Sequence, residues 1–490
     1  MTYFGRPVAR MTPSRLDNGV MRTDPARRAA YDTLRAVTDR EAYANLVLPK
    51  LLTERRLDTR DAALATELAY GALRGRGTYD AILAECVDRP LAQLDPEVLD
   101  VLRLGAHQLL ATRIPAHAAV DATVELARDV IHEGAARMVN AVLRKVGQHD
   151  LRDWVERVAP DPERDPEGYL AVYRSHPAWV VSALWDALAM HRGKEAAYDE
   201  IDRLLEADNL RPGVTLAARP GLSDQADLVE QGAEPGRYAP TAAYLPQGDP
   251  AQFEAVARGR AGVQDEGSQL VALALAAAPL DRPARDGSAE RAGDWQGELW
   301  LDLCAGPGGK AALLAAIASQ RGDRLVAAEL APHRARLVKR ALQPIQGVHK
   351  VVTANGTEPP WLSGTFDRVL VDAPCTGLGA LRRRPESRWR REPGDVSRLA
   401  TLQKKLLASA LDSTRPGGLV AYVTCSPHPA ETRLVVSDVL AGRDDVEQID
   451  ARPYLPGVPE LGDGPDVQLW PHIHDTDAMY LALLRRRETD

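Results

Sequence analysis

Hydrophobic positions recur at helical spacing through the first part of the chain. Apolar side chains form one stripe within residues 62–73 and another within residues 98–110, repeating every three or four positions. That period is typical of an amphipathic helix. Similar segments follow at 116–130 and 134–146, and no strand-like alternation interrupts them. The pattern predicts an all-α bundle.

The ends of this bundle are marked by local signals. Asp24 and Pro25 supply a helix N-cap followed by proline at the first helical position. Residues 150–165 are rich in Asp, Glu, Arg and Pro and indicate a boundary. We therefore expect a helical domain over residues 24–150, preceded by a polar, flexible arm at 1–23.

The middle of the chain, residues 151–260, has a mixed pattern that predicts a small α+β module. Helices are expected at 177–190 and 195–207, and weak strands at 213–218 and 236–244.

From residue 261 to residue 490 the pattern changes to alternating strands and helices. A helix is expected at 267–278, and the polar segment 281–298 is predicted to be a mobile loop. Alternation of this kind predicts a parallel sheet covered on both faces, the α/β Rossmann-like architecture. The expected strands are 299–303, 324–328, 350–354, 367–372, 418–424 and 479–485, and the expected helices are 309–320, 332–343 and 397–414.

Charge and cysteine usage exclude several classes of protein. A formal net charge of −8 argues against a protein that coats nucleic acid indiscriminately. The four cysteines lie far apart without the spacing of a zinc site or a disulfide scaffold. The longest apolar run, residues 270–280, is too short to span a bilayer. We expect a cytoplasmic protein, monomeric, with reduced thiols, no metal and no membrane association.

The first strand of the α/β part leads into a glycine-rich loop, Cys304 to Lys310. A P-loop would need a glycine where Cys304 stands, and the glycine spacing does not fit the dinucleotide signature. The nucleoside-binding loop of a Rossmann-like methyltransferase remains. Glu329 ends the next strand, twenty residues after Gly309, where an acid can accept hydrogen bonds from ribose hydroxyls. Alone, Glu329 could equally be a solvated acid at a helix start.

Two further cysteines follow strands of the same sheet. Asp372 and Cys375 come after one strand and Cys425 after another, and ligands of such sheets bind beyond the carboxyl ends of the strands. A thiolate that adds to C6 of a pyrimidine makes C5 nucleophilic enough to take a methyl group. Asp372 is placed to assist at N3. Two cysteines and one aspartate therefore suggest methylation of a pyrimidine at C5.

Three stretches resemble motifs of the RsmB/Sun (Fmu) family of 16S rRNA (cytosine-5)-methyltransferases: LDLCAGPGGK, DAPCTGLGALRRRPESRWRR and TCSPHPAET. IPAHAAVDATVELA and RMVNAVLRKV resemble the NusB-like RNA-binding domain of that family, while SHPAWVV and VQDEGSQLVA resemble its middle segment. The resemblance implies a NusB-like domain at 24–150, a linker module at 151–260 and a class I methyltransferase domain at 261–490.

By this resemblance, Cys425 is the nucleophile, Cys375 assists proton removal and release, and Asp372 recognises the cytosine. The cofactor implied is S-adenosylmethionine, and the implied partner is 16S rRNA. One departure is Asn355, where the family usually has an aspartate facing the adenine. A second is DAMY at 477–480, where an aromatic pair is more usual before the last strand. The residues expected to hold the cofactor are Cys304, Ala305, Gly306, Pro307, Gly308, Gly309, Lys310, Glu329, Asn355 and Asp372.

A cationic segment follows the DAPC motif. Residues 382–391 contain six arginines and one glutamate. Such a segment is either a solvated loop or a phosphate-binding surface with a tryptophan for base stacking, and we favour the second. The residues expected to contact RNA are Arg382, Arg383, Arg384, Arg388, Trp389 and Arg390.

Three alternatives stay open. A tRNA cytosine-5 methyltransferase would use the same chemistry, although the NusB-like half argues against it. A non-catalytic RNA-binding scaffold would not need Cys375, Cys425 and Asp372. The roles of the two cysteines could also be exchanged, because DNA cytosine-5 enzymes use the cysteine of the Pro-Cys motif as nucleophile.

Overall fold

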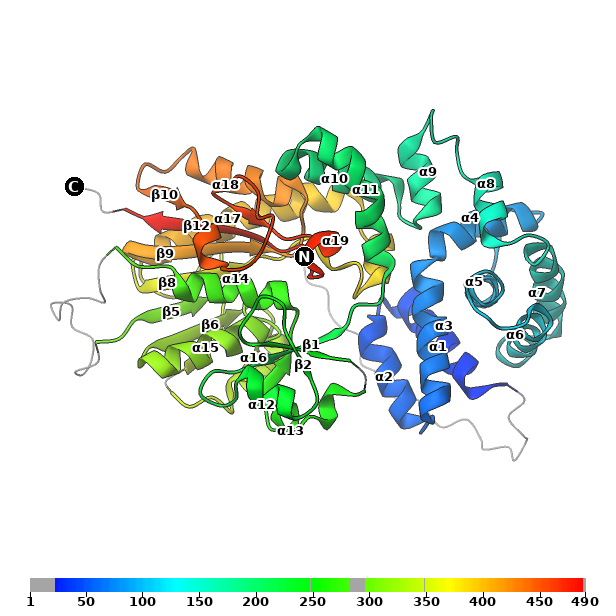
Figure 1. The fold of residues 1–490 in the computed structure, drawn as a ribbon, viewed down its shortest axis with the longest axis horizontal. Coiled ribbons are helices and arrows are strands. Elements are labelled where there is room, and N and C mark those ends of the chain that lie inside the picture. The colour runs from blue at the N-terminus through cyan, green and yellow to red at the C-terminus, as the bar shows by residue number, and fades with distance from the viewer. Residues whose placement is uncertain (1–22, 247, 282–295, 348, 488–490) are drawn as a thin grey trace. The chain divides into compact units, whose positions relative to one another are not determined.

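The computed structural model describes residues 23–246, 248–281, 296–347 and 349–487. All but the last residue of the expected arm at 1–23 and most of the expected loop at 281–298 lie outside the described residues. The chain divides into two compact units, Met1–Arg157 and Val158–Asp490 (Figure 1).

The first unit is helical, as predicted. Asp24 caps α1 through its side chain, which accepts a hydrogen bond from the Arg27 backbone N–H. The buried helix α5 packs against α1, α3, α6 and α7; a Cβ at its Gly105 would lie 2.6 Å from Leu143. The helices are α1 (Pro25–Arg40), α2 (Ala44–Glu54), α3 (Thr59–Arg74), α4 (Arg76–Cys86), α5 (Pro96–Ala111), α6 (Ala116–Val130), α7 (Glu133–Val146) and α8 (Leu151–Val158).

Helix α8 occupies the start of the predicted boundary segment. Trp154 and Val155 are buried, and the Trp154 indole N–H donates to the Val146 carbonyl at 2.8 Å. Through these contacts α8 packs against the helices before it, so the compact first unit extends past residue 150 to Arg157.

The second unit opens with α9 (Pro166–Tyr173), α10 (Ala178–Arg192) and α11 (Lys194–Asn209). A four-stranded antiparallel sheet follows, in the order β2-β3-β1-β4. Its elements are β1 (Val214–Ala218), α12 (Gln225–Glu230), β2 (Glu234–Pro235), β3 (Ala242–Leu245), α13 (Glu254–Ala257) and β4 (Ala261–Val263).

Helices α10 and α11 share a core with residues from much later in the chain. Leu184, Leu188 and Leu204 belong to the same buried cluster as Leu381 and Trp470. The middle segment is therefore packed into the second unit as part of its structure.

The large sheet of the second unit has the order β10-β12-β9-β8-β5-β6-β7, with β11 paired to β12. The five strands from β9 to β7 run parallel, as predicted. The last strand, β12, pairs antiparallel with β9 and with β10. The strands are β5 (Leu299–Asp302), β6 (Arg324–Glu329), β7 (His349–Thr353), β8 (Phe366–Asp372), β9 (Thr414–Thr424), β10 (Val446–Ile449), β11 (Val467–Gln468) and β12 (Tyr480–Arg486).

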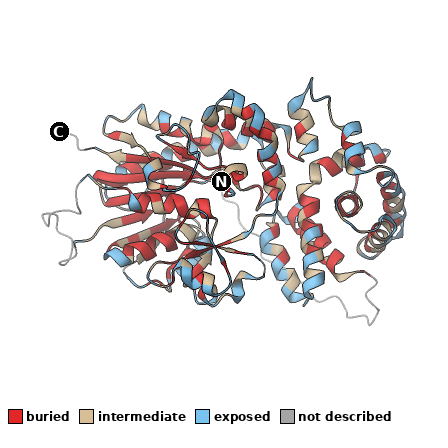
Figure 2. Cartoon of the chain, viewed as in Figure 1, coloured by how far each residue is buried: buried red, intermediate tan, exposed pale blue. Residues whose placement is uncertain are grey.

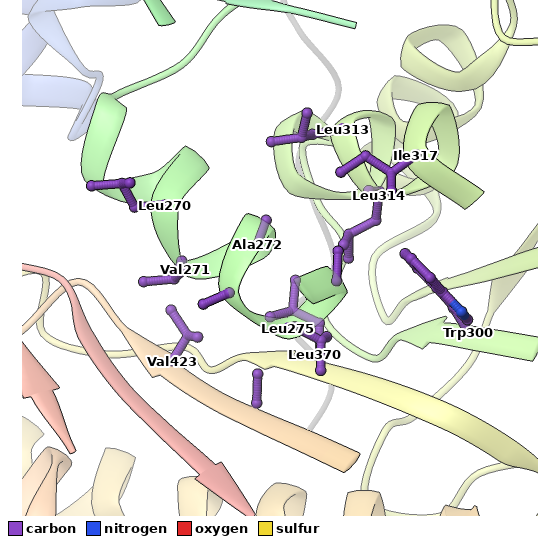
Figure 3. Packing of buried hydrophobic residues seen from close by; sticks show 14 of the residues in the cluster. Leu270, Val271, Ala272, Leu275, Trp300, Leu313, Leu314, Ile317, Leu370 and Val423 are labelled. Atoms are coloured by element: carbon purple, nitrogen blue, oxygen red, sulfur yellow. The ribbon is translucent and has the colours of Figure 1, made fainter. Parts of the chain in front are cut away.

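Helices cover both faces of this sheet, and its central strands are almost wholly buried (Figure 2). On one face, Leu275 of α14 and Leu314 of α15 pack with Leu370 and Val423 of the strands (Figure 3). On the other face, Val369 packs with residues of α17 and α18. The helices are α14 (Glu266–Ala277), α15 (Gly309–Arg321), α16 (Pro332–Leu342), α17 (Pro393–Ser413) and α18 (Arg433–Leu440).

Candidate active site

The glycine-rich loop after β5 lies directly against Glu329 at the end of β6. The Gly306 backbone N–H donates to the Glu329 carboxylate at 3.1 Å, and the Ala331 N–H donates to its other oxygen at 2.9 Å. A Cβ at Gly306 would lie 2.1 Å from that carboxylate, so no larger residue fits without displacing it. Loop and acid thus meet as the sequence predicted.

The glycines also fix how helix α15 begins. Gly308 has φ +117°, a conformation that favours glycine, and a Cβ there would lie 2.8 Å from Ala341 of α16. Arg334 of α16 donates to the Gly306 carbonyl at 2.5 Å. The loop is therefore held closely against α16, with its turn set by backbone geometry.

Asp302, the last residue of β5, is a buried acid that the sequence analysis did not single out. It is 1% exposed, and no side chain of the described residues hydrogen-bonds to either carboxylate oxygen. Burial, and to a lesser extent the nearby Asp372 carboxylate, raises the pKa of Asp302 to about 8, although a hydrogen bond with the Cys304 backbone opposes the shift. A buried acid without a side-chain partner at the end of a strand is unusual and indicates a functional position.

Lys310 and Asp372 form an ion pair beside Asp302. The Lys310 Nζ lies 2.9 Å from an Asp372 oxygen. Burial lowers the pKa of Lys310, but the contact with Asp372 outweighs it and the net shift is upward. The ammonium therefore stays charged and joins the glycine loop to the end of β8.

Cys375 and Cys425 are brought together, as expected from their positions after β8 and β9. Their sulfur atoms lie 3.3 Å apart, at hydrogen-bond distance for two thiols. The hydrogen bond to Cys425, followed by burial, raises the pKa of Cys375 well above that of an ordinary thiol. Cys375 therefore keeps its proton more firmly than an ordinary thiol does, with its sulfur at hydrogen-bond distance from that of Cys425.

Asn355 lies in an exposed turn just after β7. Its side-chain oxygen accepts hydrogen bonds from the Thr357 N–H at 3.1 Å and the Thr357 hydroxyl at 2.9 Å. The neighbouring Gly356 is buried, and a Cβ there would lie 2.9 Å from Leu406. The turn is thus held in place at the carboxyl edge of the sheet.

The arginines after the DAPC motif are placed differently from one another. Arg382 is 4% exposed and pairs with Asp265, Asp475 and Asp477. Arg383 pairs with Asp265 at 2.6 Å and Asp477 at 2.9 Å. These two guanidinium groups bind carboxylates of the protein itself.

Arg388 is fully buried, which makes it unsuited to a phosphate contact. Its guanidinium donates to the Ser175 carbonyl at 3.0 Å, the Asn209 side chain at 2.8 Å and the Asp208 carbonyl at 3.2 Å. Direct RNA contacts expected of Arg382 and Arg388 are not supported, because carboxylates and carbonyls inside the protein surround them. Arg384 is exposed, and Trp389 and Arg390 are half-buried.

A second set of polar residues, which the sequence analysis missed, surrounds the two cysteine loops. Glu431 is fully buried and accepts hydrogen bonds from Thr376 and Gln403. The Thr376 hydroxyl also lies 3.1 Å from the Ser426 hydroxyl. Glu431 and Thr376 stand inside the quoted motifs, but nothing in one sequence separates them from solvated polar residues.

Two family models match this chain. Residues 294–485 match the model described as 16S rRNA methyltransferase RsmB/F, and residues 24–148 match the NusB family. The chain is also 30% identical over 480 residues to the probable ribosomal RNA small subunit methyltransferase B of Bacillus subtilis, covering 95% of this chain and 100% of that protein. This chain belongs to the RsmB/F family of rRNA methyltransferases.

The likeness to other proteins extends over nearly the full length of this RsmB/F family member. The putative methyltransferase Rv1407 of Mycobacterium tuberculosis is 51% identical over 465 residues, which cover 94% of this chain and 97% of that one. The solved structure of PH0851 has the same fold, with a TM-score of 0.75 at 20% identity, covering 94% of this chain and 99% of that one. The helical first unit is thus a NusB domain and the second contains the methyltransferase fold.

In the described part of this RsmB/F family chain, no helix combines the length and apolarity needed to cross a membrane. Nor do His, Cys, Asp and Glu gather there in a group that could hold a metal ion.

Proposed function

We propose that this chain transfers a methyl group from S-adenosylmethionine to C5 of a cytosine in 16S rRNA, in the cytoplasm, through a covalent cysteine adduct. The observation that supports this most directly is the pair of sulfur atoms 3.3 Å apart after strands β8 and β9. Asp372, at the end of β8, pairs in register with Val423 of β9. One pyrimidine ring placed there would meet both thiols and the carboxyl group.

The arrangement suits stepwise chemistry at the base. Cys425, as thiolate, adds to C6, while protonation or hydrogen bonding at N3, for which Asp372 is placed, lowers the barrier. The electron-rich C5 then takes the methyl group that S-adenosylmethionine supplies. A base then takes the C5 proton, a step in which Cys375 assists. The electron pair left behind forms the C5–C6 double bond, and the C6–S bond breaks to return Cys425 as thiolate. Cys375, hydrogen-bonded to the Cys425 sulfur, assists this release.

The residues of the glycine loop fit the proposed cofactor. The buried Asp302 carboxyl group, which has no side-chain partner among the described residues, and the Lys310–Asp372 pair offer one end of the loop to an amino-acid group. Glu329 lies at the other end, where ribose hydroxyls would bind. The neighbouring Leu330 is 67% exposed and offers an apolar surface to an adenine ring. Cys304 to Lys310, Glu329 and Asn355 would therefore line the cofactor along the edge of the sheet.

The accessible residues of the cationic segment are the ones proposed to contact RNA. Arg384 is exposed and Trp389 and Arg390 are half-buried, close in sequence to the DAPC loop. Cations and an aromatic ring together suit single-stranded RNA, and the target base must leave its stack to reach a thiol. Binding should weaken as salt concentration rises.

Replacing each cysteine separately tests the assignment. Cys425→Ala should abolish methyl transfer to 16S rRNA, because no sulfur remains to add to C6. Cys375→Ala should instead accumulate a covalent RNA–protein adduct that survives denaturing electrophoresis. Cys86→Ala, at a buried cysteine of the NusB domain, serves as the control with unchanged activity. An active Cys425→Ala variant would contradict the choice of nucleophile.

Sequencing bisulfite-treated rRNA and tRNA from a deletion strain tests the substrate. A 5-methylcytosine lost from 16S rRNA alone is expected, whereas loss from tRNA would replace the rRNA proposal. A titration that finds no affinity for S-adenosylmethionine would favour a non-catalytic RNA-binding scaffold.

A further inference from the structure

Glu431 is a buried carboxylate placed between the two cysteine loops. It ends the short helical turn Pro429–Glu431, after Cys425, and has 0% exposure. One of its oxygens accepts the Thr376 backbone N–H at 2.8 Å and the Gln403 amide at 3.0 Å. The other accepts the Thr376 hydroxyl.

These bonds satisfy the carboxylate without a counter-charge. Among the described residues, no Lys, Arg or His forms an ion pair with Glu431. Burying a carboxylate costs free energy unless hydrogen bonds replace its contacts with water. The three donors must therefore stay in place for the local structure to persist. Glu431 and its donors therefore form a rigid unit.

The same unit holds both sides of Cys375. Thr376 follows Cys375 directly, and Gln403 also donates to the carbonyl of Pro374, which precedes it, at 2.9 Å. Each neighbour of the cysteine is thus tied to Glu431, one directly and one through Gln403. The Cys375 side chain itself is left free to face Cys425.

The unit also reaches the loop of Cys425. The Thr376 hydroxyl gives its proton to Glu431, so it must accept the hydrogen bond from the Ser426 hydroxyl at 3.1 Å. Ser426 follows Cys425 directly and also accepts the His428 N–H at 3.3 Å. Thr376 is therefore the one side chain that joins Glu431 to both cysteine loops in these contacts.

We propose that Glu431 is a positioning residue that acts through Thr376 to hold the Cys375 thiol beside the Cys425 sulfur, and so serves the release of methylated RNA. The inference rests on the proposed cysteine roles. A catalytic group displaced by about 1 Å can lose about a hundredfold in rate. Loosening this unit should therefore slow release more than adduct formation.

The sharpest probe is Thr376→Val, which keeps the side-chain shape and the backbone bond but removes the hydroxyl. We expect kcat for 16S rRNA methylation to fall by about ten- to a hundredfold. Affinity for S-adenosylmethionine should stay unchanged, and the covalent RNA–protein adduct should accumulate. Thr376→Ser, which keeps the hydroxyl, should restore turnover.

Glu431→Ala and Glu431→Gln extend the test to the carboxylate. The alanine variant should accumulate adduct, whereas the glutamine can still accept from Thr376 N–H and Gln403 and donate to the Thr376 oxygen, and should recover most activity. Glu266→Ala is the matched control, because Glu266 is a buried carboxylate that accepts the N–H groups of Tyr238 and Ala239 away from the cysteines. It should lower the melting temperature without adduct.

Cys375→Ala tests the proposed cysteine roles separately from the positioning role of Glu431. If that variant forms no adduct, the proposed cysteine roles fail. If it forms adduct but folded Thr376→Val and Glu431→Ala do not, the positioning role of Glu431 is wrong. Reduced activity in Thr376→Val with weakened cofactor binding and no adduct would likewise assign Glu431 a purely structural role.

Discussion

At the scale of single residues, Asp302 lowers the stability of the fold at neutral pH while it serves the proposed cofactor site. Its two oxygens lack side-chain partners among the described residues, and burial, aided by the nearby Asp372 carboxylate, raises its pKa to about 8, above the ordinary value of 3.8. Between those values the folded protein holds a proton that the unfolded chain releases. Stability contributed by this group is therefore complete below about pH 4 and is lost as the pH rises toward 8.

Asp302→Asn should remove this pH dependence. The amide has nearly the same shape and no charge. The melting temperature of the variant should therefore exceed that of the wild type at pH 8, and the two melting temperatures should differ little at pH 4.5. Thermal unfolding at the two pH values, followed for the second unit, measures it. Asp208 and Asp323, whose pKa values are also raised, titrate in both proteins and cancel in the comparison. An equal difference at both pH values would contradict the prediction.

The same substitution should weaken S-adenosylmethionine binding, because it replaces the carboxyl group proposed to face the cofactor by an amide that cannot ionise. A stabilised but poorly binding variant is the behaviour expected of strained active-site residues. Isothermal titration at pH 7 would measure the affinity of both proteins.

At the scale of elements, the arginines after β8 connect distant segments rather than only facing solvent. Arg382 joins the loop after β8 to Asp265 before α14 and to Asp477 before β12. Removing one partner of a buried ion pair leaves the other charges uncompensated, which costs about 3–5 kcal/mol.

Arg382→Met should therefore lower the free energy of unfolding of the second unit by roughly 3 kcal/mol. Arg336→Met, at an exposed position of α16, should change it by less than about 0.5 kcal/mol. Urea denaturation of both variants provides the comparison. Equal free energies of unfolding for the two variants would mean that the buried ion-pair network contributes little to stability.

These arginines also show where prediction from sequence stops. The count of cations in 382–391 is visible in the sequence, but Asp265 and Asp477, which neutralise two of them, are distant along the chain. The periodic elements around the site, such as β8 and α15, were predictable within one or two residues because their hydrophobic pattern is strong. The short strands β10 and β11 carry too few residues for a pattern.

The candidate site was predictable to the same extent. Cys375 and Cys425 come together because parallel strands end at one edge, a rule that needs no coordinates. Asp302 and Glu431 could not be recognised, since their importance lies in burial and in missing or crowded hydrogen bonds. Such properties appear only when the whole environment is known.

At the scale of the whole molecule, the residue at which a fragment begins decides whether that fragment can fold. The two compact units meet at residues 157 and 158. A fragment of residues 158–490 keeps α10 and α11 with Leu381 and Trp470, whereas a fragment of residues 261–490 exposes Leu378, Leu381 and Trp470.

We expect fragment 158–490 to be soluble and to unfold cooperatively, and fragment 261–490 to aggregate or to be cleaved rapidly by trypsin. Limited proteolysis and circular dichroism would compare them. A stable, cooperative fragment 261–490 would show that the cluster of α10 and α11 is dispensable for the fold.

That cluster has a consequence for synthesis on the ribosome. The NusB domain is made first and forms a compact unit of its own, so we expect it to fold while translation continues. Helices α10 and α11 emerge next, but Leu381 and Trp470, which cover part of their apolar surface, arrive much later. The nascent chain therefore carries an uncovered hydrophobic surface through most of the translation of the catalytic region, and this interval is when chaperones are needed most.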